Sequence, residues 1–361
     1  MLAARVGHFD AAEYFSPVEA RRLDRCQQLA LAAAQDALDS AAVNLPAPER
    51  CAVVCGIGLG ASATYEQQFA GLAGRGPRGI SPLTVPTIMP SSTAALLSLR
   101  FGFRGPAITV SAACASGAMA VGEGVELLRR GAADLVLAGG AEALVTYAAM
   151  CAFLRLDAMT RHIDDPPLAS RPFDVDRDGF VMGEGAGFVV LRGVADADDA
   201  LGFVLGYGTN SDAHHLVAPA QDGEGAARCM RLALDDANLC LAEVNHVNAH
   251  GTSTPLNDLA EARALAAVFD GAAVPVTSNK GTTGHLIAGS GAVEAIMALW
   301  SLRHGLVPPV AGLRTIDPAF GTLDVVKYAP RALPAGVGLS NSFGFGGANA
   351  SLVLGLSPTA D

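Results

Sequence analysis

The stretch Ala107-Ile-Thr-Val-Ser-Ala-Ala-Cys-Ala-Ser-Gly-Ala118 changes character in its middle. Its first four residues are apolar or β-branched, which predicts a short buried strand, and the apolar residues of 119–130 have helical spacing. Cys114 therefore falls at a helix start, where backbone N–H groups and the helix dipole stabilise a thiolate. We expect Cys114 to be a nucleophile with a lowered thiol pKa. A buried, inert cysteine is the commoner role for this residue type taken alone.

Three segments of the second half carry polar or flexible residues where strands are expected to end. They are Val247-Asn-Ala-His-Gly-Thr-Ser-Thr254, the segment 275–294 and the Gly-rich loop 339–350 before a last strand at 351–354. The first contains His250, and the second contains Lys280 and His285. Sheets of α/β proteins place their sites at the carboxyl ends of strands, so these residues and Cys114 form a coherent set. Either histidine alone could equally be structural.

Taken together, these motifs resemble the β-ketoacyl-acyl carrier protein synthases, condensing enzymes of the thiolase-like superfamily. The motifs, in the family's order, are Cys114, His-Gly-Thr-Ser-Thr at 250–254, Asn-Lys-(x4)-His at 279–285 and Asn-Ser-Phe-Gly-Phe-Gly-Gly at 341–347. The resemblance runs from about residue 9 to residue 355. Its Cys-His-His pattern is that of the elongating synthases, whereas the initiating type uses Cys-His-Asn and thiolases use a second Cys.

The resemblance implies an α/β, thiolase-like fold of two similar halves, with mixed sheets layered between helices in the order α-β-α-β-α. Residues 1–195 would form the half with the nucleophile, and residues 196–361 the half with the catalytic histidines and lysine. Strand-like runs support this division, at 52–54, 107–110, 135–138 and 187–191, then at 203–206, 244–248, 275–277 and 350–354. The family opens with a strand for which residues 1–8 leave little room, so we expect part of one sheet edge to be unpaired.

The chemistry implied is decarboxylative Claisen condensation of an acyl chain with malonyl-acyl carrier protein, as in fatty acid or polyketide chain elongation. Cys114 would hold the acyl chain as an acyl-enzyme, and the backbone N–H groups of Cys114 and Phe345 would form the oxyanion hole. His250 and His285 would stabilise the enolate left by loss of CO2. Phe345 would also act as the gate residue that moves when the cysteine is acylated.

The resemblance assigns supporting positions as well. Lys280 would set the charge state of its neighbours, and Glu294 would anchor Lys280 or a water molecule. The remaining substrate-binding positions are Thr252 and Thr254, for the phosphopantetheine arm, with Phe343, Gly344 and Gly346. For Asp258 and Glu261 we expect a structural or dimer-related role rather than a catalytic one.

Composition limits the partners. The net charge of −11 and the lack of a basic stripe disfavour nucleic acid. The implied partner is an acyl carrier protein, which is acidic, so docking needs a local basic patch. Arg21 and Arg22 are the best candidates, although they could be ordinary surface charges. The family also implies a homodimer, built through a strand that follows the nucleophile region.

No cofactor, metal or membrane span is expected. The segment 51–61 resembles a dinucleotide loop but lacks the acidic residue about 20 positions on, and 174–184 resembles a calcium loop whose closing Glu comes one position early. The uncharged run 79–99 contains three prolines, so it cannot be a lipid-facing helix. Seven cysteines without a CxxC pair and an amino terminus without a signal peptide predict a cytoplasmic protein.

Two alternatives to a condensing enzyme remain open. One is a non-catalytic chain-length or scaffold partner of a condensing enzyme, although such partners usually lack the nucleophile. The other, weaker, is a hydrolase or simple acyltransferase that uses Cys and His without condensation.

Overall fold

The computed structural model describes residues 1–196, 200–270, 272–333 and 336–358. Most of its strands form two five-stranded sheets. The first has the order β1-β5-β4-β2-β3, with β1 at Ala3–Ala4, β2 at Cys51–Gly56, β3 at Ala107–Val110, β4 at Leu135–Ala143 and β5 at Met182–Arg192. The second has the order β6-β12-β11-β7-β8, with β6 at Phe203–Ser211, β7 at Val244–Asn248, β8 at Val276–Thr277, β11 at Val337–Gly344 and β12 at Ala348–Gly355. A short pair, β9 at Leu306–Val307 and β10 at Arg331–Ala332, stands apart.

The two sheets repeat one pattern. In the first, β2 runs parallel to β3 and β4, and β4 runs antiparallel to β5. In the second, β7 runs parallel to β8 and β11, and β11 runs antiparallel to β12. The prediction of two similar halves with mixed sheets is therefore confirmed, while the boundary at 195/196 stays a prediction.

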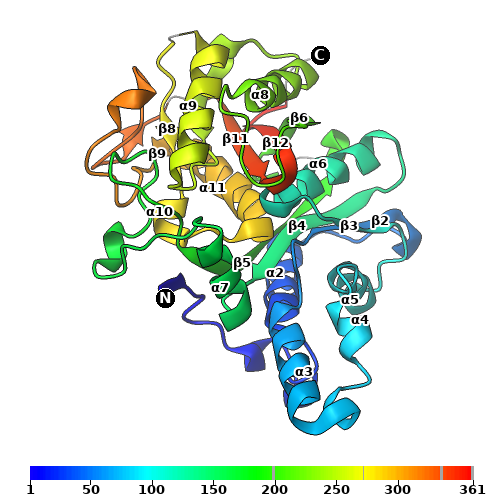
Figure 1. Cartoon of the computed structure of the whole chain (residues 1–361). Coiled ribbons are helices and arrows are strands. Elements are labelled where there is room, and N and C mark those ends of the chain that lie inside the picture. The colour runs from blue at the N-terminus through cyan, green and yellow to red at the C-terminus, as the bar shows by residue number, and fades with distance from the viewer. Residues whose placement is uncertain (197–199, 271, 334–335, 359–361) are drawn as a thin grey trace.

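Helices form three layers around these sheets (Figure 1). The central layer is α6 (Ser116–Arg129) and α11 (Ser290–His304), which share one apolar core with β2, β4 and β12. The outer layers are α2 (Arg25–Ala41) and α5 (Ser92–Phe101) on the first sheet, and α8 (Glu224–Asp236) and α9 (Pro255–Phe269) on the second. This is the predicted α-β-α-β-α arrangement. The remaining helices are α1 (Pro17–Ala20), α3 (Ser62–Arg75), α4 (Thr84–Ile88), α7 (Tyr147–Arg155) and α10 (Lys280–Thr283).

Small residues let the central layer pack closely. A Cβ on Gly117 of α6 would lie 2.6 Å from the carbonyl oxygen of Ala288 and 2.9 Å from the backbone nitrogen of Ala292. Contacts this short leave no room for a side chain, so Gly117 fixes how near the two central helices approach each other. Because Cys114 immediately precedes α6, this contact also sets the position of the sulfur relative to the second half.

The loop expected at 339–350 is mostly strand. β11 runs to Gly344 between β7 and β12, and only Phe345–Gly347 forms the turn. Its polar run was misleading because the side chains of Ser340 and Asn341 form hydrogen bonds inside the sheet. Asn248 Nδ2 donates to Ser340 Oγ at 3.1 Å, and Ser351 Oγ donates to Asn341 Oδ1 at 2.8 Å.

The expectation that the strand after the nucleophile forms the dimer edge is wrong. That strand is β4, which pairs with β2 on one side and β5 on the other, so its backbone groups are occupied. Among the strands that the structure describes, the unpaired edge of the first sheet near the nucleophile belongs to β3, which precedes Cys114.

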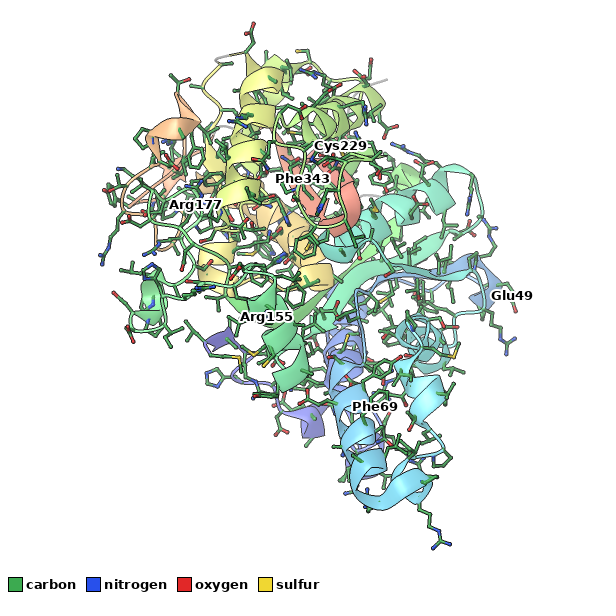
Figure 2. The ribbon with its side chains drawn as sticks, viewed as in Figure 1. Glu49, Phe69, Arg155, Arg177, Cys229 and Phe343 are labelled. Atoms are coloured by element: carbon green, nitrogen blue, oxygen red, sulfur yellow. The ribbon has the colours of Figure 1, made fainter. Side chains whose placement is uncertain are left out.

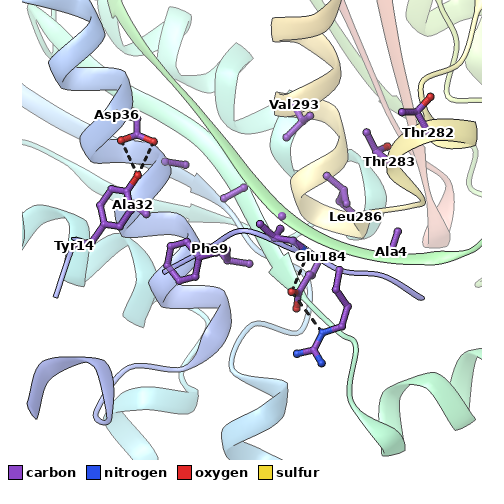
Figure 3. A pocket seen from close by; sticks show the side chains of 16 residues that line it. Ala4, Phe9, Tyr14, Ala32, Asp36, Glu184, Thr282, Thr283, Leu286 and Val293 are labelled. Atoms are coloured by element: carbon purple, nitrogen blue, oxygen red, sulfur yellow. Dashed lines mark hydrogen bonds and ion pairs between the residues drawn. The ribbon is translucent and has the colours of Figure 1, made fainter. Parts of the chain in front are cut away.

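At the opposite edge, Ala3 and Ala4 pair with Met182 and Gly183. From Glu184 onward, the side of β5 that faces away from β4 has no partner strand among the described residues. The expected gap in the edge is thus present in the described residues. A pocket of about 410 Å³ lies there (Figure 3), where Glu184 accepts a hydrogen bond from the N–H of Val6. Its lining contains neither Cys114 nor either candidate histidine.

Among the described helices, none is both long and apolar enough to cross a bilayer.

Candidate active site

Cys114 lies in a short 3-10 turn between β3 and α6. Ala113 takes a φ of +48°, and Ser116 Oγ accepts from the N–H of Ala112 at 2.8 Å and donates to the carbonyl of Ala113 at 2.6 Å. Because α6 begins at Ser116, the sulfur lies at the amino end of a helix. Only 5% of the residue is exposed.

The second half brings two imidazoles to this sulfur. His285, between α10 and α11, places Nε2 3.1 Å from Cys114 Sγ. His250 follows β7, and its ring meets that of His285 edge to face with centroids 5.4 Å apart. Phe343, labelled in the upper part of the molecule in Figure 2, packs against His250 edge to face, with ring centroids 6.0 Å apart. A nucleophile from one half and two imidazoles from the other therefore share one buried site.

Fixed donors set the tautomers of both rings. The Lys280 ammonium lies 3.3 Å from Nδ1 of His250, and the backbone N–H of Ile287 donates to Nδ1 of His285 at 3.2 Å. An ammonium and a backbone N–H can only donate, so each Nδ1 must accept and each Nε2 must carry the proton. Ser290 Oγ, 3.0 Å from the same Nδ1 of His285, supports this arrangement. Both rings are therefore hydrogen-bond donors toward the reacting centre.

Ile287 donates its N–H to His285 from a strained backbone conformation. It is β-branched but has a φ of +48°, a region that costs such residues about 1–3 kcal/mol unless their surroundings hold them there. This strain marks the segment after His285 as one that the rest of the fold must support.

Lys280 is a fully buried cation. Its Nζ donates to Glu294 Oε1 at 2.6 Å and to the carbonyl oxygen of His250 at 2.6 Å. Glu294 is 1% exposed, and its other carboxylate oxygen has no hydrogen-bond partner among the described residues. Burial raises the pKa of Glu294, and Lys280 lowers it. The ion pair thus joins α10 to α11 directly behind the His250 ring.

Burial also determines the charge of the three reactive groups. It lowers the pKa of His250 and of His285 well below the usual value, with Lys280 acting in the same direction, so both rings are neutral at neutral pH. Burial raises the pKa of Cys114 to about 11, against the opposing effects of Lys280 and of the backbone N–H groups of Phe345 and Cys114. The predicted lowering of the thiol pKa is wrong for this structure, because burial outweighs the donors at the helix end.

We expect alkylation of Cys114 by iodoacetamide to accelerate about tenfold per pH unit from about pH 7 to about pH 10, because only the thiolate reacts. Peptide mass spectrometry follows this rate, with the exposed Cys240 as an internal control. A Cys114 rate that is already constant above about pH 8 would mean that the thiolate forms readily, as the sequence suggested.

Buried carboxylates hold the turn that carries His250. Glu261 accepts from the N–H groups of His250 and Gly251 at 2.8 and 2.7 Å, and Asp258 accepts from that of Ser253 at 3.2 Å. Both carboxylates lie on α9. Sequence reasoning expected a structural or dimer-related role without finding what they bind. The partners of Glu261 are backbone groups that no residue pattern reveals, whereas Asp258 also ion-pairs with Arg177 at 3.6 Å.

The turn after β11 comes very close to Cys114. A Cβ on Gly344 would lie 2.6 Å from the carbonyl oxygen of Ala112 and 3.2 Å from the Cys114 nitrogen, so only glycine fits. Gly346 takes a φ of +81° and donates to the carbonyl of Leu216 at 2.8 Å. Phe345 between them packs with Cys114 in one apolar cluster. The backbone N–H of Phe345 hydrogen-bonds to Cys114 and opposes the rise of its thiol pKa.

The remaining candidates lie at two places. Thr252 and Thr254, at the end of the His250 turn, hydrogen-bond to each other at 2.9 Å, and Thr254 also caps α9. Arg21 and Arg22 are exposed just after α1, away from this cluster, and no ion pair within the described part of the chain engages either. The structure therefore separates a reaction centre from a surface pair of cations.

Cys114, His250 and His285 also have the composition of a metal site, since their ligand atoms all lie within 4.8 Å of one another. The tautomers argue against that use. Each Nε2 carries a proton, and each Nδ1 faces a donor that cannot accept one, so neither ring offers a lone pair toward the sulfur. The donor set fits oxyanion stabilisation better than metal binding.

This fold and site define an acyltransferase-class condensing enzyme of the thiolase-like type. Family models for the N-terminal and C-terminal domains of β-ketoacyl synthases match residues 1–197 and 201–314. The chain belongs to the β-ketoacyl synthase family.

Relatives and solved structures agree with this assignment. The chain is 39% identical over 360 residues to 3-oxoacyl-[acyl-carrier-protein] synthase 2 of Staphylococcus aureus strain COL, covering 98% of this chain and 86% of that protein. A β-ketoacyl synthase from Burkholderia phymatum STM815 superposes with a TM-score of 0.91 at 33% identity, over 98% of this chain and 88% of the other. The complex AntDE:AntF, described as a type II PKS acyl-carrier protein with its ketosynthase bound to the hexaketide, gives a TM-score of 0.88 at 28% identity, over 92% and 85%.

Proposed function

We propose that this protein joins an acyl chain held on Cys114 to a malonyl unit carried by an acyl carrier protein, with release of CO2 and formation of a 3-oxoacyl thioester. The observation that carries the proposal is the distance of 3.1 Å between Cys114 Sγ and His285 Nε2, with His250 in the same cluster. Family membership and the relative named as a 3-oxoacyl synthase support it.

In the first step the Cys114 thiolate attacks the carbonyl carbon of the acyl-carrier thioester. A bond from carbon to Sγ forms and the bond to the carrier sulfur breaks, so the carrier leaves as a thiolate, which takes up the proton that Cys114 released when it ionised. The negative charge passes to the carbonyl oxygen, for which the N–H groups of Cys114 and Phe345 are the donors next to the sulfur. A donor of this kind is typically worth about 3–4 kcal/mol.

In the second step the malonyl unit loses CO2, and the electron pair of the broken C–C bond becomes an enolate. The Nε2–H groups of His250 and His285 are suited to bind its oxygen. The enolate carbon then attacks the acyl carbon, and the bond to Sγ breaks, which regenerates the thiolate. Decarboxylation supplies the nucleophile, so we propose that no metal or redox cofactor takes part.

Incubation with acyl carrier and malonyl carrier, followed by mass spectrometry of the 3-oxoacyl product and of acyl-Cys114, tests this function. A hydrolase would release free acid, and a simple acyltransferase would move acyl groups without releasing CO2. A non-catalytic partner would show neither acyl-enzyme nor product, and retention of Cys114, His250 and His285 argues against it. His285→Ala should acylate but not decarboxylate; equal loss of both steps would refute its role in decarboxylation.

We further propose that Arg21 and Arg22 dock the acidic carrier, a partner that also appears in the AntDE:AntF complex. Reversing both charges with Arg21→Glu and Arg22→Glu should raise KM for the carrier roughly tenfold at low salt, with kcat little changed and the effect fading as salt is added. The double variant Arg228→Glu and Arg231→Glu, at two exposed positions of α8, is the control with the same change in charge. If KM for the carrier is unchanged, the docking surface lies elsewhere.

A cytoplasmic location of the protein stays a prediction.

We propose that the protein forms a homodimer through the β3 edge. The strand has an open side, and α3 presents Tyr65, Phe69 and Leu72 at the surface although no residue of that helix is buried. Open strand edges and exposed apolar stripes are usually covered. Sedimentation at micromolar concentration should give twice the 36.7 kDa of one chain; a monomer would contradict the proposal.

A further inference from the structure

Glu142, the second-last residue of β4, is a buried carboxylate that the proposed mechanism does not use. Its Oε2 accepts from the N–H groups of Gly58 and Leu59 at 2.8 and 3.2 Å, and its Oε1 accepts from that of Gly60 at 2.8 Å. A carboxylate with three such donors in a dry environment forms a strong connection. The turn between β2 and α3 is thereby attached to the end of β4.

This turn lies against the segment that follows His285. A Cβ on Gly58 would lie 2.2 Å from Glu142 Oε2 and 3.5 Å from Ile287 Cγ2, so the turn fills the space between the carboxylate and that side chain. A Cβ on Gly289 would lie 3.5 Å from the Glu142 nitrogen. The residues after His285 are therefore packed directly on Glu142 and on the turn it holds.

Ile287 needs such support. Its φ of +48° is unfavourable for a β-branched residue and persists only where neighbouring atoms leave no alternative. In this conformation its N–H donates to Nδ1 of His285 at 3.2 Å. Ser290 Oγ, the other partner of this atom, can donate or accept, so the Ile287 N–H is the contact that fixes the proton on Nε2. If the turn moved away, Ile287 could relax, and its N–H would leave the ring.

We infer that Glu142 is a positioning residue: its carboxylate holds the 58–60 turn against Ile287 and so fixes the Nε2–H tautomer of His285. Burial raises the pKa of the Glu142 carboxyl to about 7, and the three N–H donors oppose this, so a test at about pH 8 examines the ionised form. The consequence for decarboxylation rests on the proposed function, whereas the tautomer of the ring does not.

The test compares Glu142→Gln with Asp174→Asn. Asp174 is also a buried carboxylate with three backbone donors, the N–H groups of Asp176, Arg314 and Thr315 at 2.9, 2.7 and 2.8 Å. Each change keeps the side-chain volume and turns an acceptor into a donor. Only the first lies beside Ile287, so Asp174→Asn controls for general damage to the fold.

Nitrogen-15 NMR of histidine-labelled protein reads the tautomer directly, with the His285 signals assigned by their loss in His285→Asn. Wild type and Asp174→Asn should show Nε2–H on His285, and Glu142→Gln should show a mixture of tautomers. Single-turnover decarboxylation in Glu142→Gln should fall ~10- to 100-fold relative to acylation of Cys114. An unchanged tautomer, or the same change in Asp174→Asn, would overturn the inference.

Ile287→Gly keeps the inference testable if Glu142→Gln does not fold. Glycine tolerates a φ of +48° but removes the side chain that the turn contacts, so it should also mix the tautomers of His285. A pure Nε2–H form in that variant would contradict the proposed link through Ile287. The NMR measurement of the His285 tautomer needs no turnover. It therefore tests the inference even if the protein fails the condensation assay.

Discussion

Cys114→Ala is expected to abolish acyl-enzyme formation and to lower condensation on the order of a million-fold, the loss seen when an enzyme with a covalent intermediate is deprived of its nucleophile. No other thiol lies in the cluster that surrounds this position, so no substitute can receive the acyl chain. Intact-protein mass spectrometry after incubation with acyl carrier measures the first effect, and a single-turnover product assay measures the second.

A matched pair of variants separates the loss of sulfur from damage to the site. Cys240→Ala removes an exposed thiol and should leave acylation unchanged. Cys114→Gln places a carbonyl where the acyl thioester would stand, so it should lack condensation yet still decarboxylate malonyl carrier with His250 and His285. If the glutamine variant releases no CO2, the two steps are not divided among these residues as proposed.

The sequence motifs identified candidate residues that the structure brings together, although their catalytic roles stay predictions. His250 follows β7 and Phe345 follows β11, and these parallel neighbours deliver their carboxyl ends to one edge of the second sheet. Cys114 follows β3 of the first sheet and meets them through the central helix layer. Strand positions in the apolar runs were also predictable. Among the longer strands the exception was β11, because Ser340, Asn341 and Ser342 look like loop residues until the neighbouring strands that bond the first two are known. The two-residue strands β1, β9 and β10 were also missed.

Two features of the site could not be predicted from the sequence: the effect of burial on pKa values, and the hydrogen bonds that buried carboxylates accept from backbone groups. The pKa of Cys114 is raised by desolvation, which no local pattern measures, so the helix-end argument gave the wrong sign. Glu142 and Glu261 bind backbone N–H groups, and Glu142 and Gly58 are 84 residues apart. Such partners have no residue signature, and only the fold brings them together.

Lys280→Ala is expected to lower the free energy of unfolding by about 3–5 kcal/mol at neutral pH, the usual cost of removing one partner of a buried ion pair. Glu294 would be left as a buried carboxylate with no cation beside it, because Lys280 provides the ion pair it has in the structure. Urea denaturation at about pH 7.5 measures the loss. Activity should fall as well, because Nδ1 of His250 loses the ammonium that fixes its tautomer.

The pH dependence of this loss identifies its cause. Burial already raises the pKa of Glu294, and removing Lys280 takes away an effect that lowers it. A carboxyl whose folded pKa is raised favours the folded state below its unfolded pKa of about 4.3 and loses that advantage as the pH rises through the folded value. The penalty of Lys280→Ala should therefore shrink when the pH falls from about 7.5 to about 5.

The double variant Lys280→Met with Glu294→Leu separates stability from catalysis. Removing both charges leaves no unpaired buried ion, so stability should return to within about 1–2 kcal/mol of wild type. Condensation should stay low, because methionine cannot donate to Nδ1 of His250 and the Nε2–H form is no longer fixed. If the double variant recovered activity together with stability, Lys280 would be only a structural cation, and the proposed control of the His250 tautomer would be wrong.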